Sequence, residues 1–471
     1  MKTWHKVAYA AGSLGTAVSY QAFANRIQFF YIDVIGISAA TVGVVWFIYG
    51  LWNAINDPLM GDLSDRTRTR WGRRIPYIRF GAIPLGVLFV LLWAPPGGID
   101  PALVVVYFFV TIFLFDGLWS LIVIAWTALF PEMYQREYER AFVAGLREGF
   151  SVIGLIIGIA LPAVLVANFG WVGMGAIIAV VTVGSFLVSL LGSREDPANI
   201  PEQSLGLRAS LRVTLANRAF LWFMVANLSK EIIFLLLVAV FPFYAKYVIH
   251  LTDGAVVLGM TMDAATQETF ALGALFVLAI PMLFVWTRIT QRIGGRRAWQ
   301  VGSLLLAPGL VVMFLASDFH TAMLGILLMA LGFPALLMTH NLLLADLIDE
   351  DELNIGQRRE GAYFGVNGAI IRLAFAVQGI LFTFILPLSG YIAPPEGVGY
   401  IEQPASAILG FRILVGVVPI VCLGVSLFAL ERYPLHGPRL EAVQSRQAAR
   451  FAARFATPPA QDAAPPARPH T

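Results

Sequence analysis

Residues 52–76, WNAINDPLMGDLSDRTRTRWGRRIP, form the most informative segment of the sequence. Its first residues end an apolar segment, and the arginine-rich break that follows turns at Gly72-Arg73-Arg74. A similar turn, RIGGRR, occupies residues 292–297 in the second half of the chain. Equivalent loops at equivalent places are what two duplicated halves produce. We therefore expect two related halves, each made of apolar segments joined by polar turns.

The composition excludes an ordinary soluble enzyme. Of the 471 residues, 58% are hydrophobic and 13% are charged, whereas soluble domains carry about 25% charged residues. Disordered chains are excluded too, because they are poor in apolar residues. Runs of about 20 apolar residues, the length of a membrane-spanning helix, recur along the chain, and they lack the alternation of β-barrel strands. The sequence therefore predicts an all-α polytopic membrane protein.

Twelve apolar segments can be distinguished, separated by breaks rich in proline, glycine or arginine. They cover residues 7–32, 38–61, 76–95, 101–130, 142–167, 171–192, 218–247, 266–287, 298–316, 321–346, 361–389 and 409–431. The breaks after even-numbered segments contain arginines, whereas odd-numbered breaks such as 36–40 and 95–101 contain no Lys or Arg. The positive-inside rule then places both termini in the cytoplasm.

The longest internal polar break separates the segments into two groups of six. We expect an N-terminal half over residues 1–192, a cytoplasmic loop over 193–217 and a C-terminal half over 218–435. Residues 436–471 are rich in Ala, Pro, Arg and Gln. They are expected to form a short amphipathic or disordered cytoplasmic tail.

Other chemistries are not indicated by the sequence. The net charge of +3 is explained by arginines in the cytoplasmic breaks, so no nucleic-acid partner is expected. Phosphate-binding glycine loops, metal-spaced His or Cys pairs and a nucleophile elbow are missing. We therefore expect no enzyme, no metal site and no cofactor. The expected partners are the lipid bilayer, a small-molecule solute and a coupling cation, bound by a monomer.

The motifs of the chain resemble those of the glycoside-pentoside-hexuronide:cation symporters, the melibiose permease-like family of the major facilitator superfamily. The matching segments are 30–36, 52–61, 64–67, 70–76, 128–133, 139–140, 345–352 and 358–363, together with Arg147. The resemblance implies a twelve-helix fold of two halves in a bacterial inner membrane. It also implies symport by alternating access, in which a cation gradient drives a sugar or related solute inward.

Charged residues inside the predicted spans are candidates for function, since a charge at mid-bilayer costs at least about 2.5 kcal/mol. Asp57 lies in the second span beside Asn56 and one turn after Asn53. The family has two carboxylates one turn apart here that bind Na⁺, Li⁺ or H⁺, and Asn53 replaces the first. We expect Asp57 to be the coupling residue, with H⁺ favoured over Na⁺; a structural packing role is the alternative. The resemblance adds the hydroxyl of Ser120 to this site.

The solute site departs from the family pattern. The sugar-binding carboxylates of the melibiose permease correspond to Ala17 and Val123, and its stacking tryptophan corresponds to Thr127. The candidate solute-binding residues are Arg26, Asp116, Thr127, Arg147, Asn367 and Arg372. The resemblance implies a sugar or glycoside as solute, and because an intramembrane arginine offers a planar fork to a carboxylate, a uronate-like solute is expected as well. A lysolipid or another amphiphile is the alternative cargo.

Several intramembrane charges have two interpretations. Asp116 either supplies the missing carboxylate of the cation site or pairs with Arg26. Arg26 and Arg147 either bind the solute or are neutralised by Asp116, Asp57 or Glu148.

The second half adds three such residues. Lys230 and Glu231 point about 100° apart on their helix, so they form a gate or simply line the cavity. His340 is either a proton relay or a hydrogen-bonded packing residue.

Polar residues of the cytoplasmic breaks are expected to form an inner gate. They are Asp65, Arg66, Arg70 and Arg73, facing Glu139, Arg140 and the acidic run 349–352 with Arg359. Exposed ion pairs are individually worth about 0–1 kcal/mol, so closure requires a network. Outside transport, the alternative function is a non-transporting membrane assembly protein, which the intramembrane charges disfavour.

Overall fold

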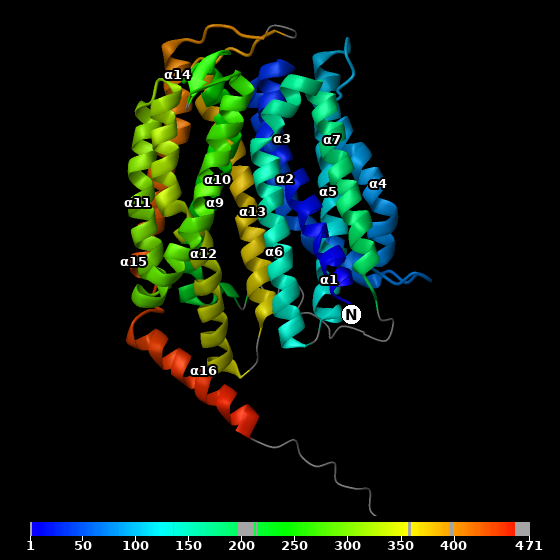
Figure 1. Cartoon of the computed structure of the whole chain (residues 1–471), viewed down its shortest axis with the longest axis vertical. Coiled ribbons are helices and arrows are strands. Elements are labelled where there is room, and N and C mark those ends of the chain that lie inside the picture. The colour runs from blue at the N-terminus through cyan, green and yellow to red at the C-terminus, as the bar shows by residue number, and fades with distance from the viewer. Residues whose placement is uncertain are drawn as a thin grey trace, which may run out of the picture.

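The computed structural model describes residues 2–134, 136–195, 212, 214–257, 259–356, 359–395 and 399–456. Its helices run side by side along the long axis of the molecule (Figure 1). The first half contains α1 (Thr3–Ala10), α2 (Gly12–Phe29), the π-helix η1 (Phe30–Val34), α3 (Ala39–Arg66), α4 (Ile75–Leu91), α5 (Pro101–Met133), α6 (Glu137–Ala160) and α7 (Pro162–Gly192). The second half contains α9 (Arg218–Tyr247), β1 (Ala255–Val257), β2 (Met260–Met262), α10 (Ala264–Ile293), α11 (Gly295–Leu315), α12 (Phe319–Ile355), α13 (Glu360–Leu388), α14 (Ala405–Arg412), the π-helix η2 (Ile413–Val417), α15 (Val418–Arg432) and α16 (Pro438–Ala456).

The helices agree with the predicted membrane architecture. Among the described residues, ten helices are long and apolar enough to cross a membrane, and Ile75–Leu91 is a shorter apolar helix. The first predicted span is divided between α1 and α2, which are joined at Ala11. An all-helical membrane bundle is therefore confirmed, whereas the count of twelve spans and the side on which the termini lie stay predictions.

A glycine marks the predicted break between the fifth and sixth spans. Gly170 has non-helical backbone angles, φ 70° and ψ 178°, within α7. Only glycine adopts a positive φ at little steric cost, so the helix breaks at this residue. α6 itself ends at Ala160, and Pro162 begins α7 where its missing N–H has no intrahelical partner to lose.

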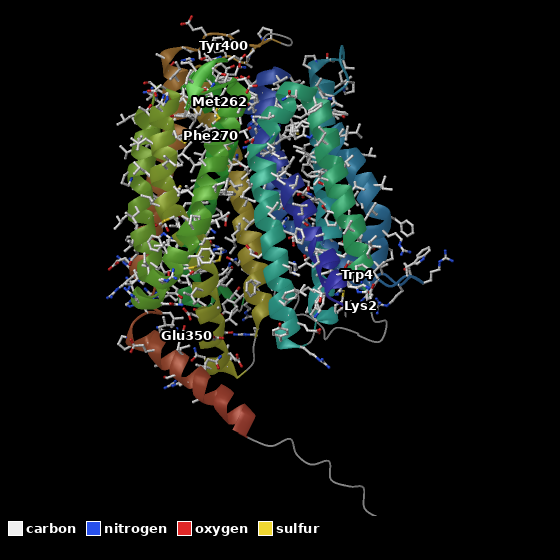
Figure 2. All side chains as sticks on the ribbon, viewed as in Figure 1. Lys2, Trp4, Met262, Phe270, Glu350 and Tyr400 are labelled. Carbon is white, nitrogen blue, oxygen red and sulfur yellow. The ribbon has the colours of Figure 1, made fainter. Side chains whose placement is uncertain are left out.

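The two ends of the bundle differ in composition. One end carries the N-terminus, α16 and the arginine-containing loops, and we call it the arginine-rich end; Lys2, Trp4 and Glu350 lie there (Figure 2). The opposite end carries the antiparallel pair of β1 and β2 with Met262, and we call it the hairpin end. Tyr400 also lies at the hairpin end (Figure 2).

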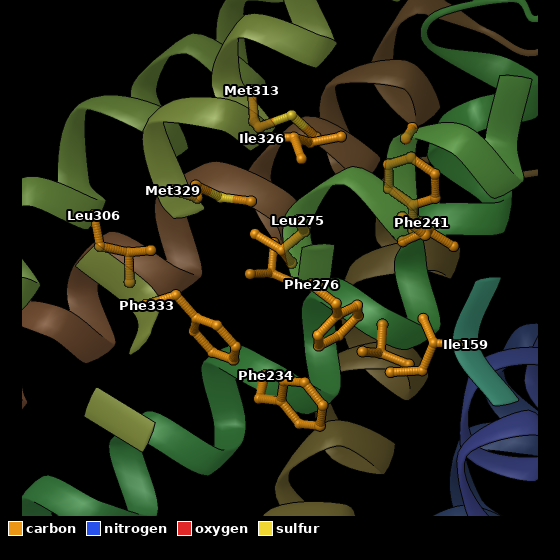
Figure 3. Close-up of a pocket in the computed structure, with 14 residues that line it drawn as sticks. Ile159, Phe234, Phe241, Leu275, Phe276, Leu306, Met313, Ile326, Met329 and Phe333 are labelled. Carbon is orange, nitrogen blue, oxygen red and sulfur yellow. The ribbon is translucent and has the colours of Figure 1, made fainter. Parts of the chain in front are cut away.

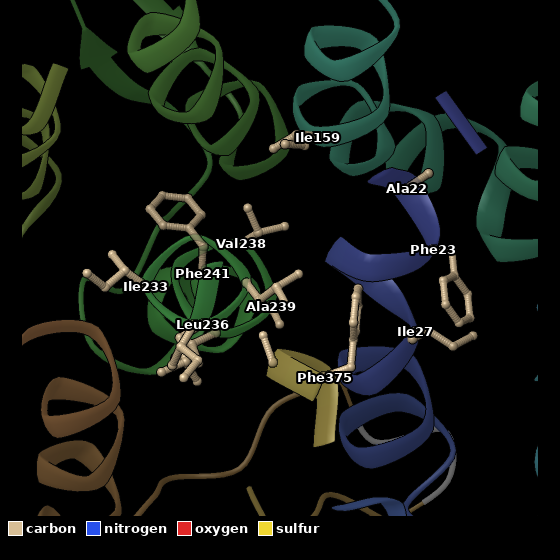
Figure 4. Packing of buried hydrophobic residues seen from close by; sticks show 14 of the residues in the cluster. Ala22, Phe23, Ile27, Ile159, Ile233, Leu236, Val238, Ala239, Phe241 and Phe375 are labelled. Carbon is tan, nitrogen blue, oxygen red and sulfur yellow. The ribbon is translucent and has the colours of Figure 1, made fainter. Parts of the chain in front are cut away.

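The halves meet closely along α3 and α13. A Cβ atom at Gly50 would lie 2.2 Å from the backbone nitrogen of Ala376, and one at Gly43 would lie 2.2 Å from Thr383 Oγ1. Apolar side chains of α2, α9 and α13, such as Phe375, fill the neighbouring contact between the halves (Figure 4). Glycine at these positions therefore permits a backbone approach that any larger side chain would prevent.

The tail begins with the amphipathic helix α16, which lies across the arginine-rich end (Figure 1). Arg439 Nε donates to Glu350 Oε1 of α12 at 2.7 Å, and Val443 is buried. Of the two expectations for residues 436–471, the structure therefore gives an amphipathic helix for Pro438–Ala456. Residues 457–471 lie outside the described part of the chain.

Candidate functional site

Asp57 of α3 and Arg372 of α13 meet at the contact between the two halves. Arg372 Nη2 lies 2.5 Å from Asp57 Oδ2, and Arg372 Nη1 donates to the side-chain oxygen of Asn53. The side chains stay partly accessible, with 18% of Arg372 and 32% of Asp57 exposed. Residues predicted for cation coupling and for solute binding therefore form one cluster that spans both halves.

Asp116 of α5 is fully buried behind this cluster. Asn56 Nδ2 donates to Asp116 Oδ2 at 2.8 Å, and the Tyr49 hydroxyl donates to Asp116 Oδ1 at 3.1 Å. The structure does not form the expected pair with Arg26, because the guanidinium of Arg26 is bound to Glu268 of α10 at 2.7 Å. Asp116 is instead bound to Asn56, the neighbour of Asp57 in α3, and its role in the cation site stays a prediction.

The Ser120 hydroxyl interacts with the Asp57 carboxylate, and three oxygen atoms of this cluster are buried. They are Asn56 Oδ1, Asp57 Oδ1 and Ser120 Oγ. Buried polar atoms are normally hydrogen-bonded, and carboxylate, amide and hydroxyl oxygens are the ligands of hard cations. The same three residues, together with Asn53, were expected to hold the coupling cation, and their buried oxygens fit that chemistry.

Arg147 of α6 stacks on aromatic rings. Its guanidinium carbon lies 4.5 Å from the ring centre of Trp126 and 4.8 Å from that of Phe130. Over the described residues no carboxylate forms an ion pair with Arg147, so the expected neutralisation by Asp116, Asp57 or Glu148 is not formed. Such stacking holds a cation without cancelling its charge.

The other two candidate solute residues lie on different helices. Thr127 is exposed on α5. Asn367 Oδ1 of α13 accepts a hydrogen bond from Asn227 Nδ2 of α9 at 2.9 Å, and both residues are buried. Asn367 therefore joins two helices of the second half in this conformation.

The expected inner-gate residues pair inside their own halves. Arg66 binds Asp62 one turn away, Arg73 binds Glu132 and Glu195, Glu139 binds Lys6, and Arg359 binds Asp351. Arg70 stacks on Trp71, and Arg140 lies over Phe130. The side chain of Asp65 and the whole of Arg358 lie outside the described residues. In this conformation these described pairs therefore stabilise each half rather than join the two.

At the hairpin end the halves are joined by a cluster that the sequence analysis did not identify. The buried carboxylate of Asp33, in η1, binds Lys246 Nζ and accepts hydrogen bonds from the hydroxyls of Tyr247 and Tyr391. Tyr391 donates at 2.7 Å. Burial, and then the neighbouring Asp33 carboxylate, raise the pKa of Tyr391 far above its usual range, so its hydroxyl remains a donor. We call these four residues the Asp33 clasp.

Hydrogen bonds between uncharged side chains also join the two halves, farther from the hairpin end than the Asp33 clasp. The side chain of Gln378 on α13 donates to Gln28 on α2 at 2.9 Å and accepts from the indole N–H of Trp46 on α3 at 3.1 Å. Asn25 of α2 donates to the carbonyl oxygen of Val238 on α9 at 3.1 Å. With the pair of Arg26 and Glu268, these contacts tie both halves together.

Lys230 and Glu231 do interact despite their different directions on α9. Lys230 Nζ lies 2.7 Å from Glu231 Oε1. His340 of α12 has a buried Nδ1, and its side chain interacts with the backbone of Leu336 and Leu337 one turn earlier on the same helix. These three residues lie in the second half and take no part in the Asp57 cluster.

Comparisons with known proteins identify the family. A family model described as MFS/sugar transport protein matches residues 8–437. The chain belongs to this family. The resemblance to melibiose permease-like symporters is thereby confirmed, and so is the prediction of a membrane transporter rather than an enzyme.

Individual relatives of the chain are named as symporters or sugar transporters. It is 27% identical to the isoprimeverose transporter of Lactiplantibacillus pentosus over 92% of this chain and 89% of that protein. It is 25% identical to the inner membrane symporter YicJ of Escherichia coli over 91% of both chains. A sodium-dependent lysophosphatidylcholine symporter, 1-A of Danio rerio, is 21% identical over 94% of this chain and 87% of that protein.

A solved structure supports the fold. The bacterial homologue of the human lysosomal transporter Spinster, in an inward-facing and unoccupied conformation, aligns with a TM-score of 0.66 at 14% identity, covering 92% of this chain and 98% of that one. Together with the apolar helices, the family assignment confirms an integral plasma-membrane protein of the major facilitator superfamily.

Proposed function

We propose that this transporter imports a sugar, glycoside or uronate-like solute together with a proton, by alternating access. The observation that carries the proposal is the cluster of Asp57, Asn53 and Arg372 between the halves. A cation or solute that binds there contacts both halves, so its binding energy can depend on their relative position. The sugar and glycoside symporters among the relatives support the solute class.

Arg372 favours a proton over sodium as the coupling ion. The negative charge of Asp57 is already neutralised by the guanidinium, Asn53 adds no charge of its own, and the carboxyl group of Asp116 is held by Asn56 and Tyr49. A sodium ion would therefore bind next to a fixed positive charge. A proton on Asp57 instead removes the charge that holds Arg372, and the released guanidinium becomes available to a hydroxyl or carboxylate of the solute.

The conformation supports alternating access. By the positive-inside rule the arginine-rich end faces the cytoplasm, so the Asp33 clasp joins the halves on the outer side. Release of the clasp and formation of an inner network by the arginine-rich loops would give the opposite state.

The decisive experiment measures uptake into proteoliposomes. A panel of sugars, glycosides, uronates and lysophosphatidylcholine is offered under an inward proton gradient, an inward sodium gradient or neither. We expect a sugar, glycoside or uronate to accumulate with the proton gradient alone. Asp57→Asn should abolish accumulation while solute exchange without a gradient continues. Asp62→Asn is the matched control, because Asp62 lies on the same helix and is exposed.

Other outcomes have defined meanings. Accumulation driven by sodium alone would refute proton coupling, and normal accumulation by Asp57→Asn would refute the role of Asp57. Movement of lysophosphatidylcholine but of no sugar would establish the lysolipid alternative, which the Danio rerio relative supports. If no member of the panel moved under either gradient, the proposed solute class would be refuted.

A further inference from the structure

The pocket shown in Figure 3 is too small to hold a solute or a lipid chain. It lies where α9, α10, α11 and α12 meet, its volume is about 40 Å³, and every lining side chain is apolar. One water molecule alone occupies about 30 Å³ of the liquid. This pocket is therefore part of the packed core and offers no binding site.

A much larger groove lies on the outside of the bundle, at the arginine-rich end of α11 and α15. These helices pack together at one edge of the molecule (Figure 1), and the open groove that they mainly form has a volume of about 670 Å³. Its floor is apolar and consists of Val301, Leu304, Leu427 and Phe428, whereas Arg297, Gln300 and Glu431 form its polar mouth. The groove is thus amphipathic along its length.

The apolar floor belongs to the lipid-facing surface of the bundle. Val301 and Leu304 of α11 are exposed, and so is Phe428 of α15. Val421 and Val425 are exposed as well, so that the exposed residues of α15 recur every three or four positions and form one stripe. An exposed apolar stripe on a membrane-spanning helix contacts hydrocarbon chains, so the floor of the groove is open to the acyl chains of the bilayer.

An ion pair at the mouth joins the two helices. Arg296 Nη2 donates to Glu431 Oε2 at 3.1 Å, and Arg296 Nε donates to the carbonyl oxygen of Leu430 at 2.6 Å. Gln300 Nε2 donates to the same carboxylate oxygen of Glu431 at 3.1 Å. The negative charge of Glu431 is therefore already neutralised, and the mouth offers no free anion to a cationic group.

Two further arginines leave the mouth positively charged. Arg297 lines the groove, and the guanidinium carbon of Arg432 lies 4.9 Å from the ring centre of Phe428. Both arginines are exposed, and over the described ranges neither forms an ion pair with a carboxylate. A guanidinium offers two parallel N–H donors to a phosphate. Leu304 lies about 10 Å deeper along α11 than Arg297, so the groove combines an anion-binding mouth with an apolar floor.

We propose that this groove binds one anionic phospholipid, with its phosphate on Arg297 and Arg432 and one acyl chain along Val301 and Leu304. By the positive-inside rule the arginine-rich end faces the cytoplasm, where basic pockets between helices bind anionic headgroups. The groove lies outside the contact between the halves, so its occupant is a bound lipid of the surrounding leaflet and not the transported solute.

The test counts the lipids that stay bound to the full chain in detergent micelles, by native mass spectrometry. The probes are phosphatidylglycerol, phosphatidylcholine and phosphatidylethanolamine with identical acyl chains. One phosphatidylglycerol should bind at least about tenfold tighter than either zwitterionic lipid, because each arginine near an anionic headgroup contributes a factor of about five.

A double variant tests the charged mouth. Arg297→Gln combined with Arg432→Gln should reduce the preference for phosphatidylglycerol to less than about twofold. The matched control is Arg70→Gln combined with Arg79→Gln, which removes the same charge from exposed positions of the first half at the same end. The control should keep the preference of the parent protein.

A tryptophan tests the apolar floor. Val301→Trp fills the groove and should weaken binding of phosphatidylglycerol about tenfold, because the acyl chain loses its contact with α11. Val311→Trp, which is exposed on α11 outside the groove, should bind phosphatidylglycerol like the parent protein. Unchanged thermal unfolding in phosphatidylcholine nanodiscs shows that each variant is folded.

Several outcomes would overturn the proposal. If the control pair of arginines lost the preference to the same extent, diffuse surface charge would explain it. If the two tryptophan variants behaved alike, no acyl chain would occupy the groove. Displacement of phosphatidylglycerol by an equal concentration of glycerol 3-phosphate would show a phosphate site without lipid recognition, and equal binding of phosphatidylethanolamine would refute the selectivity for an anionic lipid.

Discussion

The two ends of the bundle use similar ion pairs for different purposes. At the hairpin end, Asp33 of the first half binds Lys246 of the second, and its side chain is fully buried. At the arginine-rich end, Arg359 binds Asp351 of the same half, with 15% and 9% of the side chains exposed. Both pairs are shielded from solvent, so burial does not distinguish them. What distinguishes them is whether the pair connects elements that must separate during transport.

The largest effect is expected from preventing the halves from meeting. A leucine at Gly50 would collide with the backbone of Ala376, so Gly50→Leu should hold the hairpin end open. Uptake should then fall at least about 100-fold, because each transport cycle requires closure of this end. Spin labels on cysteines at Gly97 and Glu402, in a Cys422→Ala background, should report a longer distance.

Gly184→Leu provides the control for this experiment. Gly184 lies in α7, and a Cβ atom there would meet no neighbouring atom. Its label distances and uptake should match those of the parent protein. Unchanged distances in Gly50→Leu would show that the contact of α3 with α13 is not needed for closure.

A smaller effect is expected from the Asp33 clasp. Asp33→Asn leaves Lys246 without its charge partner, and removing one partner of a buried pair costs about 3 kcal/mol. The lost interaction exists only when the hairpin end is closed. The ratio of open to closed molecules should therefore rise about 100-fold. The same label pair should then show a second, longer distance.

A double variant tests whether the unpaired charge of Lys246 causes the hairpin end to open. Asp33→Asn combined with Lys246→Gln leaves no unpaired charge in the contact, so part of the closed population should return. If Asp33→Asn gives the distance distribution of the parent protein, the clasp does not hold the halves together.

The smallest effect on the distance between the halves is expected from a variant at the arginine-rich end. Arg359→Gln removes two-pronged hydrogen bonds to Asp351, but both groups move together with the second half. Uptake should change less than about twofold, while thermal unfolding moves by a few degrees to lower temperature. A population shift as large as that of Asp33→Asn would instead place Arg359 in the inner gate.

The sequence predicts contacts within one helix better than contacts between the halves. Asn53, Asn56 and Asp57 could be grouped because helical spacing alone brings them together. The partner of Asp57, however, depends on how α3 crosses α13, and Arg372 lies more than 300 residues away along the chain. Periodicity carries no information about such a crossing.

The Asp33 clasp illustrates the same limit. Asp33 lies within the family-like segment 30–36, but its partner Lys246 is 213 residues away. The sequence shows only that a carboxylate ends one predicted span and that a lysine ends another span on the same side of the membrane. Many pairings satisfy that condition, and only the three-dimensional packing selects one.

The neutral pair of Arg372 and Asp57 determines which step of the proposed cycle responds to the membrane voltage. With Arg372 and Asp57 ionised and Asp116 protonated, the empty site carries no net charge, so no charge crosses the membrane when the empty site returns. A proton with a neutral glycoside adds one positive charge, and a potential of 100 mV then contributes about 2.3 kcal/mol to each inward passage. A proton with a uronate adds none. Electrical current during uptake would therefore distinguish neutral from anionic cargo.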